Sequence, residues 1–135
     1  MAVPVNKRGE NTLEVWLKAV DLAKYTMEIT ANTKNFPGRY RAMTDRINDA
    51  AIGAAGKLWK ANKVFIGNGC DPRAKQDRAY LQNSAINDLD DLLFLIDLAG
   101  KALHRPTKKT AFWAEKTIAV KRMAVKWRES DRSRG

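Results

Sequence analysis

The stretch TKKTAFWAEKTIAVKRMAVKW, residues 107–127, indicates the fold class. A helix advances 100° per residue, and on such a helix one apolar face collects Phe112, Trp113, Val120, Met123, Ala124 and Trp127. A second, thinner apolar stripe consists of Ala111, Ala114, Ile118 and Val125. Lysines and arginines lie between the two stripes. We therefore expect this helix to pack in the core of its own domain on one side and to meet a partner on another.

Two helices are predicted in the first half of the chain. Asn11 followed by Glu14 has the spacing of a capping pair, so the first helix is expected from Asn11 to about Ala31, after a disordered lead at residues 1–10. Phe36-Pro37-Gly38 predicts a loop, because proline restricts the residue before it and glycine permits a turn. The second helix is expected from about Arg39 to Phe65.

The second half of the chain predicts two more helices. Asp71-Pro72 has the pattern of a cap followed by proline at the first helical position, and the third helix is expected from there to about Leu103. His104-Arg105-Pro106 separates it from the fourth helix, and residues 130–135 are expected to form a basic tail. Together, residues 11–129 predict an all-α fold, an antiparallel up-down-up-down four-helix bundle.

The core of this bundle is predicted from the same periodicity. In the first three helices the expected core residues are Leu13, Trp16, Val20, Ala23, Met27 and Thr30; then Tyr40, Met43, Ile47, Ala51, Ala54, Leu58, Ala61 and Phe65; and finally Ala74, Leu81, Ala85, Leu89, Leu92, Ile96 and Ala99.

The net charge of +10 favours a polyanionic partner. The charge is unevenly placed: residues 101–135 carry eleven basic and three acidic side chains, whereas residues 71–100 carry three basic and six acidic ones. No apolar run approaches the ~18 residues of a membrane span. The N-terminus lacks the apolar core of a signal peptide, and the single Cys70 cannot form an internal disulfide. We expect a cytoplasmic protein with no membrane association.

No arrangement of residues predicts an enzyme, a metal site or a cofactor. His104 is the only histidine and lies beside a loop proline, and one cysteine with one histidine is a poor metal-ligand set. Asp88, Asp90 and Asp91 are clustered, but a helix points them in different directions. The chain is therefore predicted to act by binding.

The cations of the second and fourth helices are the candidate nucleic-acid contacts. In the sequence, Lys57, Lys60 and Lys63 have no acidic neighbours, whereas a merely solvated surface normally mixes both signs. A solvated helix face is the alternative interpretation. The predicted nucleic-acid-binding residues are Lys57, Lys60, Lys63, Lys108, Lys109, Lys121, Arg122, Lys126 and Arg128.

Second apolar stripes recur on the first, third and fourth helices, and such a recurrence favours self-association in a closed ring. Trp59 lies off the core face of its helix and is the best candidate for an exposed aromatic residue. The predicted oligomer or partner interface comprises Val15, Leu22, Ile29, Trp59, Tyr80, Phe94, Leu98, Ile118 and Val125.

The anchor residues resemble a known superfamily. Leu13 to Ala19 (LEVWLKA), Leu22-Ala23, Thr30 and Phe36-Pro37 resemble the opening of the four-helix proteins encoded in ribosomal-RNA intervening sequences. The pattern from Leu81-Gln82 through residues 88–93 to Leu98-Ala99, with Lys121-Arg122-Met123 and Lys126-Trp127, is more similar to a sister group. That group is the accessory variability determinants (Avd) of diversity-generating retroelements.

The resemblance covers about residues 12–130, and one departure favours the Avd branch. Intervening-sequence proteins typically carry a Ser-Ile-Pro-x-Asn-Ile-Ala-Glu-Gly-like run in the second helix, where this chain has AIGAAGK at residues 51–57. The resemblance implies a non-enzymatic, barrel-shaped homopentamer in the cytoplasm of a bacterial or phage-infected cell. It would bind the reverse transcriptase and the template RNA of the element, with its cDNA as a further candidate partner, and support error-prone cDNA synthesis. The alternative is an intervening-sequence-type bundle that acts as a protein-interaction or ribosome-associated module.

Overall fold

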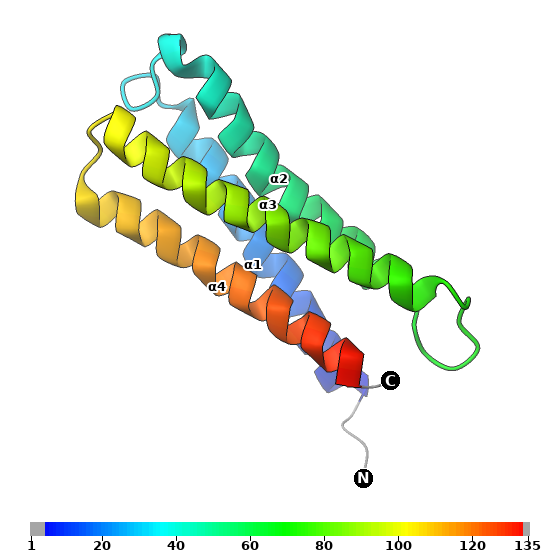
Figure 1. Ribbon diagram of the computed structural model, residues 1–135. Coiled ribbons are helices and arrows are strands. Elements are labelled where there is room, and N and C mark those ends of the chain that lie inside the picture. Colours follow the sequence, from blue (N-terminus) through cyan, green and yellow to red (C-terminus); the bar gives the residue numbers. More distant parts are fainter. Residues whose placement is uncertain (1–4, 134–135) are drawn as a thin grey trace.

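The computed structural model describes the backbone of residues 5–133 and the side chains of residues 14–133. Its four long helices are α1 (Val5–Ala31), α2 (Arg41–Lys63), α3 (Ala74–Ala102) and α4 (Thr107–Ser133), with a short 3-10 helix, η1 (Gly38–Tyr40), before α2. Successive helices run in opposite directions (Figure 1), and residues 5–133 contain no strand. The predicted all-α fold of four helices is confirmed.

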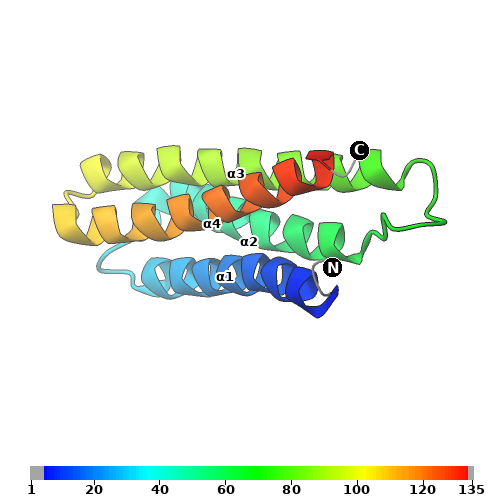
Figure 2. The same cartoon turned by 90° about the horizontal axis from the view of Figure 1, so that it is seen from below.

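The helices are not packed equally. The contact between α2 and α3 is the most extensive, α1 packs on α2, α4 packs on α3, and the contact between α1 and α4 is the smallest of the four. Helices α2 and α4 therefore occupy opposite corners of the bundle. The α1–α2 and α3–α4 connections lie together at one end, called here the two-loop end, and the α2–α3 connection lies at the other, the single-loop end (Figure 2).

The bundle core surrounds Trp113, which is fully buried. Its indole Nε1 donates a hydrogen bond of 3.1 Å to the hydroxyl of Thr26, so α4 is tied to α1 through a polar contact inside the core. Phe36 comes from the α1–α2 connection, yet it is buried and packs edge-on against Trp113, with ring centroids 6.1 Å apart. A loop residue that sequence periodicity did not include in the core thus closes one end of it.

Helix α1 buries only part of its predicted core face: Ala23 and Thr30 are buried as predicted, but the buried face is turned toward other residues. Val15 and Leu22 are 4% and 1% exposed and belong to the core, whereas Val20 and Met27 are 39% and 44% exposed. The reason lies in the neighbouring side chains of the two faces. The buried face contains the small residues Ala19, Ala23, Thr26 and Thr30, which let α1 approach the bundle closely, whereas Trp16, Leu17, Val20 and Met27 line the broader face.

The ends of several elements also differ from prediction. Helix α1 begins at Val5 rather than Asn11, because no proline separates those positions to stop the helix. Residues 1–4 of the expected lead and the side chain of Leu13 lie outside the described residues. At the other terminus α4 continues to Ser133, past the predicted start of the tail, because Asp131 is held by α3. Residues 134 and 135 of that tail also lie outside the described residues.

Two aromatic residues predicted in the core are on the surface. Phe65 lies two positions beyond the last residue of α2 and is 66% exposed, because the helix ends at Lys63 before its periodicity reaches that position. Phe112 is exposed at the edge of α4, where it packs against the ring of Tyr25. At the start of α3 the predicted cap is seen in part: the Asp71 carboxylate accepts a 2.7 Å hydrogen bond from the Arg73 backbone N–H, although the regular helix begins at Ala74.

Candidate nucleic-acid interface

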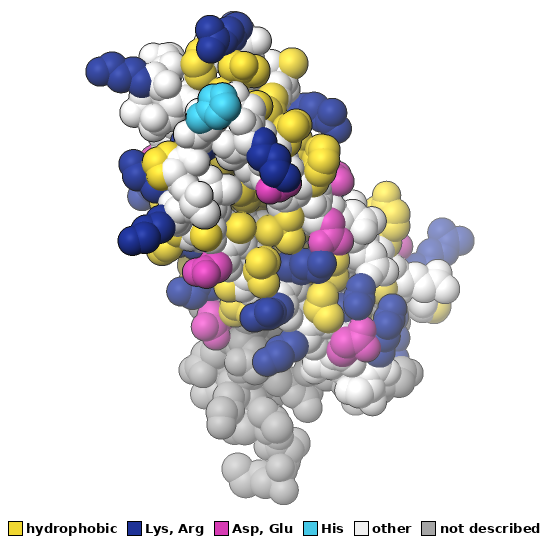
Figure 3. Space-filling model, turned by 60° about the vertical axis from the view of Figure 1, so that its left-hand side comes forward, with side chains coloured by type: hydrophobic (Ala, Val, Ile, Leu, Met, Phe, Trp, Pro, Cys, Tyr) yellow, Lys and Arg dark blue, Asp and Glu magenta, His cyan; other side chains and the backbone are white. Residues whose placement is uncertain are grey.

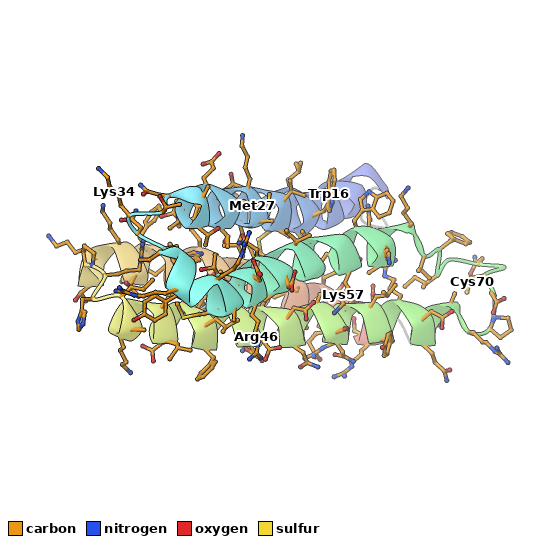
Figure 4. All side chains as sticks on the ribbon, turned by 90° about the horizontal axis from the view of Figure 1, so that it is seen from above. Trp16, Met27, Lys34, Arg46, Lys57 and Cys70 are labelled. Carbon is orange, nitrogen blue, oxygen red and sulfur yellow. The ribbon has the colours of Figure 1, made fainter. Side chains whose placement is uncertain are left out.

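The acidic residues of α3 neutralise cations of both neighbouring helices. Asp88 forms a 2.7 Å ion pair with Lys57 of α2, and Asp90 pairs with Lys121 of α4. Figure 4 shows Lys57 between α2 and α3. The prediction that Lys57 has no acidic neighbour is wrong in space, because its partner lies 31 positions further along the chain. Two of the predicted nucleic-acid contacts are therefore held by intramolecular ion pairs.

One further predicted contact at this boundary also serves the fold. The Arg128 guanidinium donates a 2.9 Å hydrogen bond to the side chain of Asn83 on α3 and also pairs with Glu129. It therefore helps to hold α4 to α3. Gly53 of α2 faces the same boundary, because a Cβ there would lie 2.9 Å from the Asp88 carboxylate. The glycine makes room for the acidic side chain that pairs with Lys57.

The remaining predicted cations are exposed, but they do not form one surface. Lys60 and Lys63 lie near the end of α2, whereas Arg122 and Lys126 lie on α4 at the opposite corner of the bundle. Lys108 and Lys109 lie in the first turn of α4, at the two-loop end, far along the helix from Arg122. A single nucleic-acid strand on one face of this chain would therefore not meet the α2 cations and the α4 cations together.

The outward face of α4 carries the clearest set of available cations. At 100° per residue Lys108, Arg122 and Lys126 fall within about 40° of one another, on the side of α4 away from its buried residues. All three side chains are exposed, and within residues 14–133 no ion pair involves them. Glu115 and Glu129 lie on the same face. Figure 3 shows lysines and arginines over one face of the molecule, interspersed with hydrophobic and acidic side chains.

On α2, Lys63 is held by an aromatic ring. Its Nζ lies 3.9 Å from the centroid of Trp59, within the range of a cation–π contact. Trp59 is 42% exposed, in agreement with its predicted position off the core face. The ammonium group and the indole therefore form one exposed amphipathic surface at the end of α2.

The predicted interface residues divide into three groups. Tyr80, Phe94 and Leu98 lie on the outer face of α3 and are exposed, as expected for a surface available to a partner, and Trp59 is exposed on α2. Ile118, Val125 and Ile29 are half-buried, the last two against the core. Val15 and Leu22 are buried in the chain's own core, so their assignment to an interface is wrong.

An exposed apolar surface that was not predicted lies across α1 and α2. The side chains of Thr30 and Asn48 are hydrogen bonded to each other and set the register of the two antiparallel helices. In that register Met27 lies level with Ile52, and Val20 lies level with Trp59. All four are large and exposed. Val20 and Met27 were assigned to the core, because a helix with two apolar stripes does not reveal which one is buried, whereas Trp59 was predicted to be exposed.

Comparison with known proteins returned no match: no protein-family model, no curated protein and no solved structure matches the chain. Among the described residues, no group of three or more histidine, cysteine, aspartate or glutamate side chains is placed to hold a metal ion. None of the helices, as far as the structure describes them, has the length and apolarity needed to cross a membrane.

Proposed function

We propose that the chain is a non-enzymatic nucleic-acid-binding protein, and that it serves as the accessory variability determinant of a diversity-generating retroelement. In that role it binds the element's reverse transcriptase and template RNA, and it supports mutagenic cDNA synthesis. The observation that carries the binding part of the proposal is the outward face of α4, where Lys108, Arg122 and Lys126 are exposed and without ion-pair partners among the described side chains. The retroelement role rests on the sequence resemblance.

Contacts of this kind act on the phosphate backbone. Flexible, exposed ammonium and guanidinium groups release counterions when they meet phosphates, which gives binding that is steeply salt-dependent and only weakly sequence-selective. One subunit offers few such contacts on any one face. We propose that a homo-oligomer, a pentamer according to the resemblance, brings several copies of the α4 face to one RNA, so that weak contacts add up.

A charge-reversal pair tests the RNA-binding face. Arg122→Glu with Lys126→Glu should weaken binding to a structured RNA at least about tenfold and reduce the slope of log K against log salt by roughly 2. The matched control is Lys18→Glu with Lys24→Glu, which changes the net charge equally at two exposed positions of α1. Filter binding over a range of salt concentrations measures both. Equal losses in the two double variants would show that net charge alone matters and would refute a specific α4 face.

The polymerase role needs its own test. The chain should co-elute in gel filtration with RNA and with the reverse transcriptase encoded in its genomic neighbourhood. When both are present, all three should elute together. A neighbourhood without a reverse-transcriptase gene and without a near-repeat that differs at adenines would count against the retroelement role, whatever the RNA binding.

The apolar surfaces favour a second candidate, an intervening-sequence-type module that binds proteins. Met27, Ile52, Val20 and Trp59 on α1 and α2, and Tyr80 and Phe94 on α3, present large exposed apolar side chains. If the chain forms a defined oligomer or protein complex but neither double variant changes its retention on RNA, this second function is favoured.

A further inference from the structure

A basic pocket lies at the two-loop end of the bundle. Its volume is about 180 Å³, and it is lined by Lys34 and Asn35 of the α1–α2 connection, Leu103, His104, Arg105 and Pro106 of the α3–α4 connection, and Lys109 of α4. Four of these seven residues are lysine, arginine or histidine, and none is acidic. Lys34 lies at the end of the bundle opposite Cys70 (Figure 4). The pocket is thus remote from the α2 and α4 cations at the single-loop end.

Arg105 is fixed beneath this pocket by aromatic rings. Its guanidinium carbon lies 5.1 Å from the ring centroid of Phe36 and 5.7 Å from that of Trp113. Its Nε is buried and has no hydrogen-bond partner within the described residues. Burial lowers the pKa of Arg105 below the usual range of a guanidinium. The side chain is therefore held rigidly, partly out of water, and without an acidic partner among the residues that line the pocket.

The backbone around the pocket has an uncommon conformation. His104 has φ of 52°, in the left-handed region, where glycine is the usual residue at the end of a helix. The Arg105 N–H donates to the carbonyl of Gly100, which closes the end of α3 and turns the chain into α4. Strained positions of this kind gather at binding sites. The first turn of α4, which includes Lys109, contains no acidic residue to occupy the free N–H groups of the helix start.

We propose that this pocket binds a phosphate group, either as a free phosphate monoester or as the terminal phosphate of a nucleic-acid strand. The volume lies below the ~300–1,000 Å³ of pockets for drug-sized ligands, so it suits a small anionic group rather than a whole nucleotide. A dianion would accept hydrogen bonds from the partly buried Arg105 guanidinium, and it would neutralise Lys34 of the α1–α2 connection and Lys109 of α4. The proposal does not depend on the α4 face or on the retroelement role.

Inorganic phosphate is the first probe. In a titration at constant ionic strength, with sodium chloride as the balancing salt, phosphate should shift the Arg105 side-chain Nε–H resonance and the backbone amides of residues 104–109. Lys34→Met with Lys109→Met should weaken phosphate binding about tenfold or more, because two charged contacts are lost. Both lysines are exposed, so the double variant is expected to fold normally.

Lys24→Met provides the control. It removes the same charge from an exposed position of α1, but Lys24 neither lines the pocket nor belongs to the proposed RNA face, so the phosphate affinity should change less than about twofold. Shifts absent up to roughly 10 mM phosphate, tenfold above a weak millimolar affinity, would overturn the proposal. Equal effects of the Lys24→Met and Lys109→Met single variants would overturn it too.

A second experiment distinguishes the two sources of the phosphate. A short oligoribonucleotide with a 5′-phosphate and the same sequence with a 5′-hydroxyl are compared for binding and for shifts at Arg105. A preference of about tenfold for the phosphorylated strand, lost in the Lys34→Met, Lys109→Met variant, assigns the pocket to strand ends. Equal binding of the two strands, with free phosphate still bound, assigns it to a small phosphate monoester. Loss of RNA binding in the α4 double variant with phosphate binding intact would separate this pocket from the proposed RNA face.

Discussion

At each end of the bundle an arginine guanidinium lies over aromatic rings, but the charges around the two arginines differ. At the single-loop end the Arg78 guanidinium lies 4.6 Å from the centroid of Trp127, and at the two-loop end the Arg105 guanidinium lies over Phe36 and Trp113. Arg78 has an acidic partner, since its Nε lies 2.8 Å from the Asp131 carboxylate, which also accepts a 2.8 Å hydrogen bond from Gln82. The lining around Arg105 contains no acid.

The difference supports a structural role for the single-loop end and the proposed phosphate-binding role for the two-loop end. A mostly buried arginine is stabilised when a carboxylate and an aromatic ring share its charge, as at Arg78, and there it ties α4 to α3. An arginine held by the rings alone keeps its capacity for an anion from outside. Three predictions test this contrast, in order of expected effect.

The largest effect is expected at the Arg78–Asp131 ion pair of the single-loop end. Asp131→Asn keeps the size of the side chain but removes the carboxylate charge beside Arg78, and both side chains of this pair are nearly buried, at 12% and 13% exposed. Breaking such a pair costs roughly 3–5 kcal/mol of the free energy of unfolding. Urea denaturation measures it. Asp97→Asn is the control, because the Lys101–Asp97 pair is exposed and worth about 0–1 kcal/mol. A loss below about 1 kcal/mol at Asp131 would show that this end is not held by the ion pair.

An intermediate effect is expected at the hydrogen bond between Trp113 and Thr26, because Trp113 is one of the rings that contact Arg105. Thr26→Val removes the hydroxyl that accepts the Trp113 Nε1–H bond and leaves a buried donor unsatisfied, at a cost of about 1–3 kcal/mol. Thr117→Val is the matched control: this threonine is equally buried, but its hydroxyl only donates back to the Trp113 carbonyl in its own helix. Thermal unfolding should show a clearly larger loss for Thr26→Val. Equal losses of stability would mean that the hydrogen bond from the Trp113 indole to Thr26 makes no special contribution at the two-loop end.

The smallest effect is expected at His104, and there the substitution should raise the free energy of unfolding rather than lower it. His104→Gly relieves the left-handed backbone, but glycine also gains freedom in the unfolded chain, so the net stabilisation should be about 0.5–1 kcal/mol. For a domain of this size that raises Tm by roughly 2–5 °C. His104→Ala should give no such rise, because alanine is no better suited to this φ. If the strain serves the pocket, the more stable glycine variant should also bind phosphate more weakly.

Much of the fold could be predicted from sequence, because helix periodicity and loop signals act over a few residues. The loop at Phe36-Pro37-Gly38, the start of α4 at Thr107, and the burial of Leu58, Leu89, Trp113 and Trp127 agree with the pattern. Helix α1 shows the limit. Its two apolar stripes are equivalent by periodicity, and the choice between them depends on how closely the other helices approach.

The candidate sites were less predictable for the same reason. The ion pairs of Lys57 with Asp88 and of Lys121 with Asp90 join residues about 30 positions apart, and a local count of charges does not contain them. The pocket likewise depends on two loops about 70 residues apart in the chain that meet only at the end of the folded bundle.

By itself, the sequence determined that the chain forms four amphipathic helices with a surplus of positive charge, because helical periodicity and net charge are properties of the residues alone. Only the tertiary structure decided which stripe of α1 is buried and which cations are already neutralised. It also decided that Arg105 lies on two aromatic rings with no acidic residue in the described lining of its pocket, because burial and ion pairing depend on which distant segments the packing of the helices brings together.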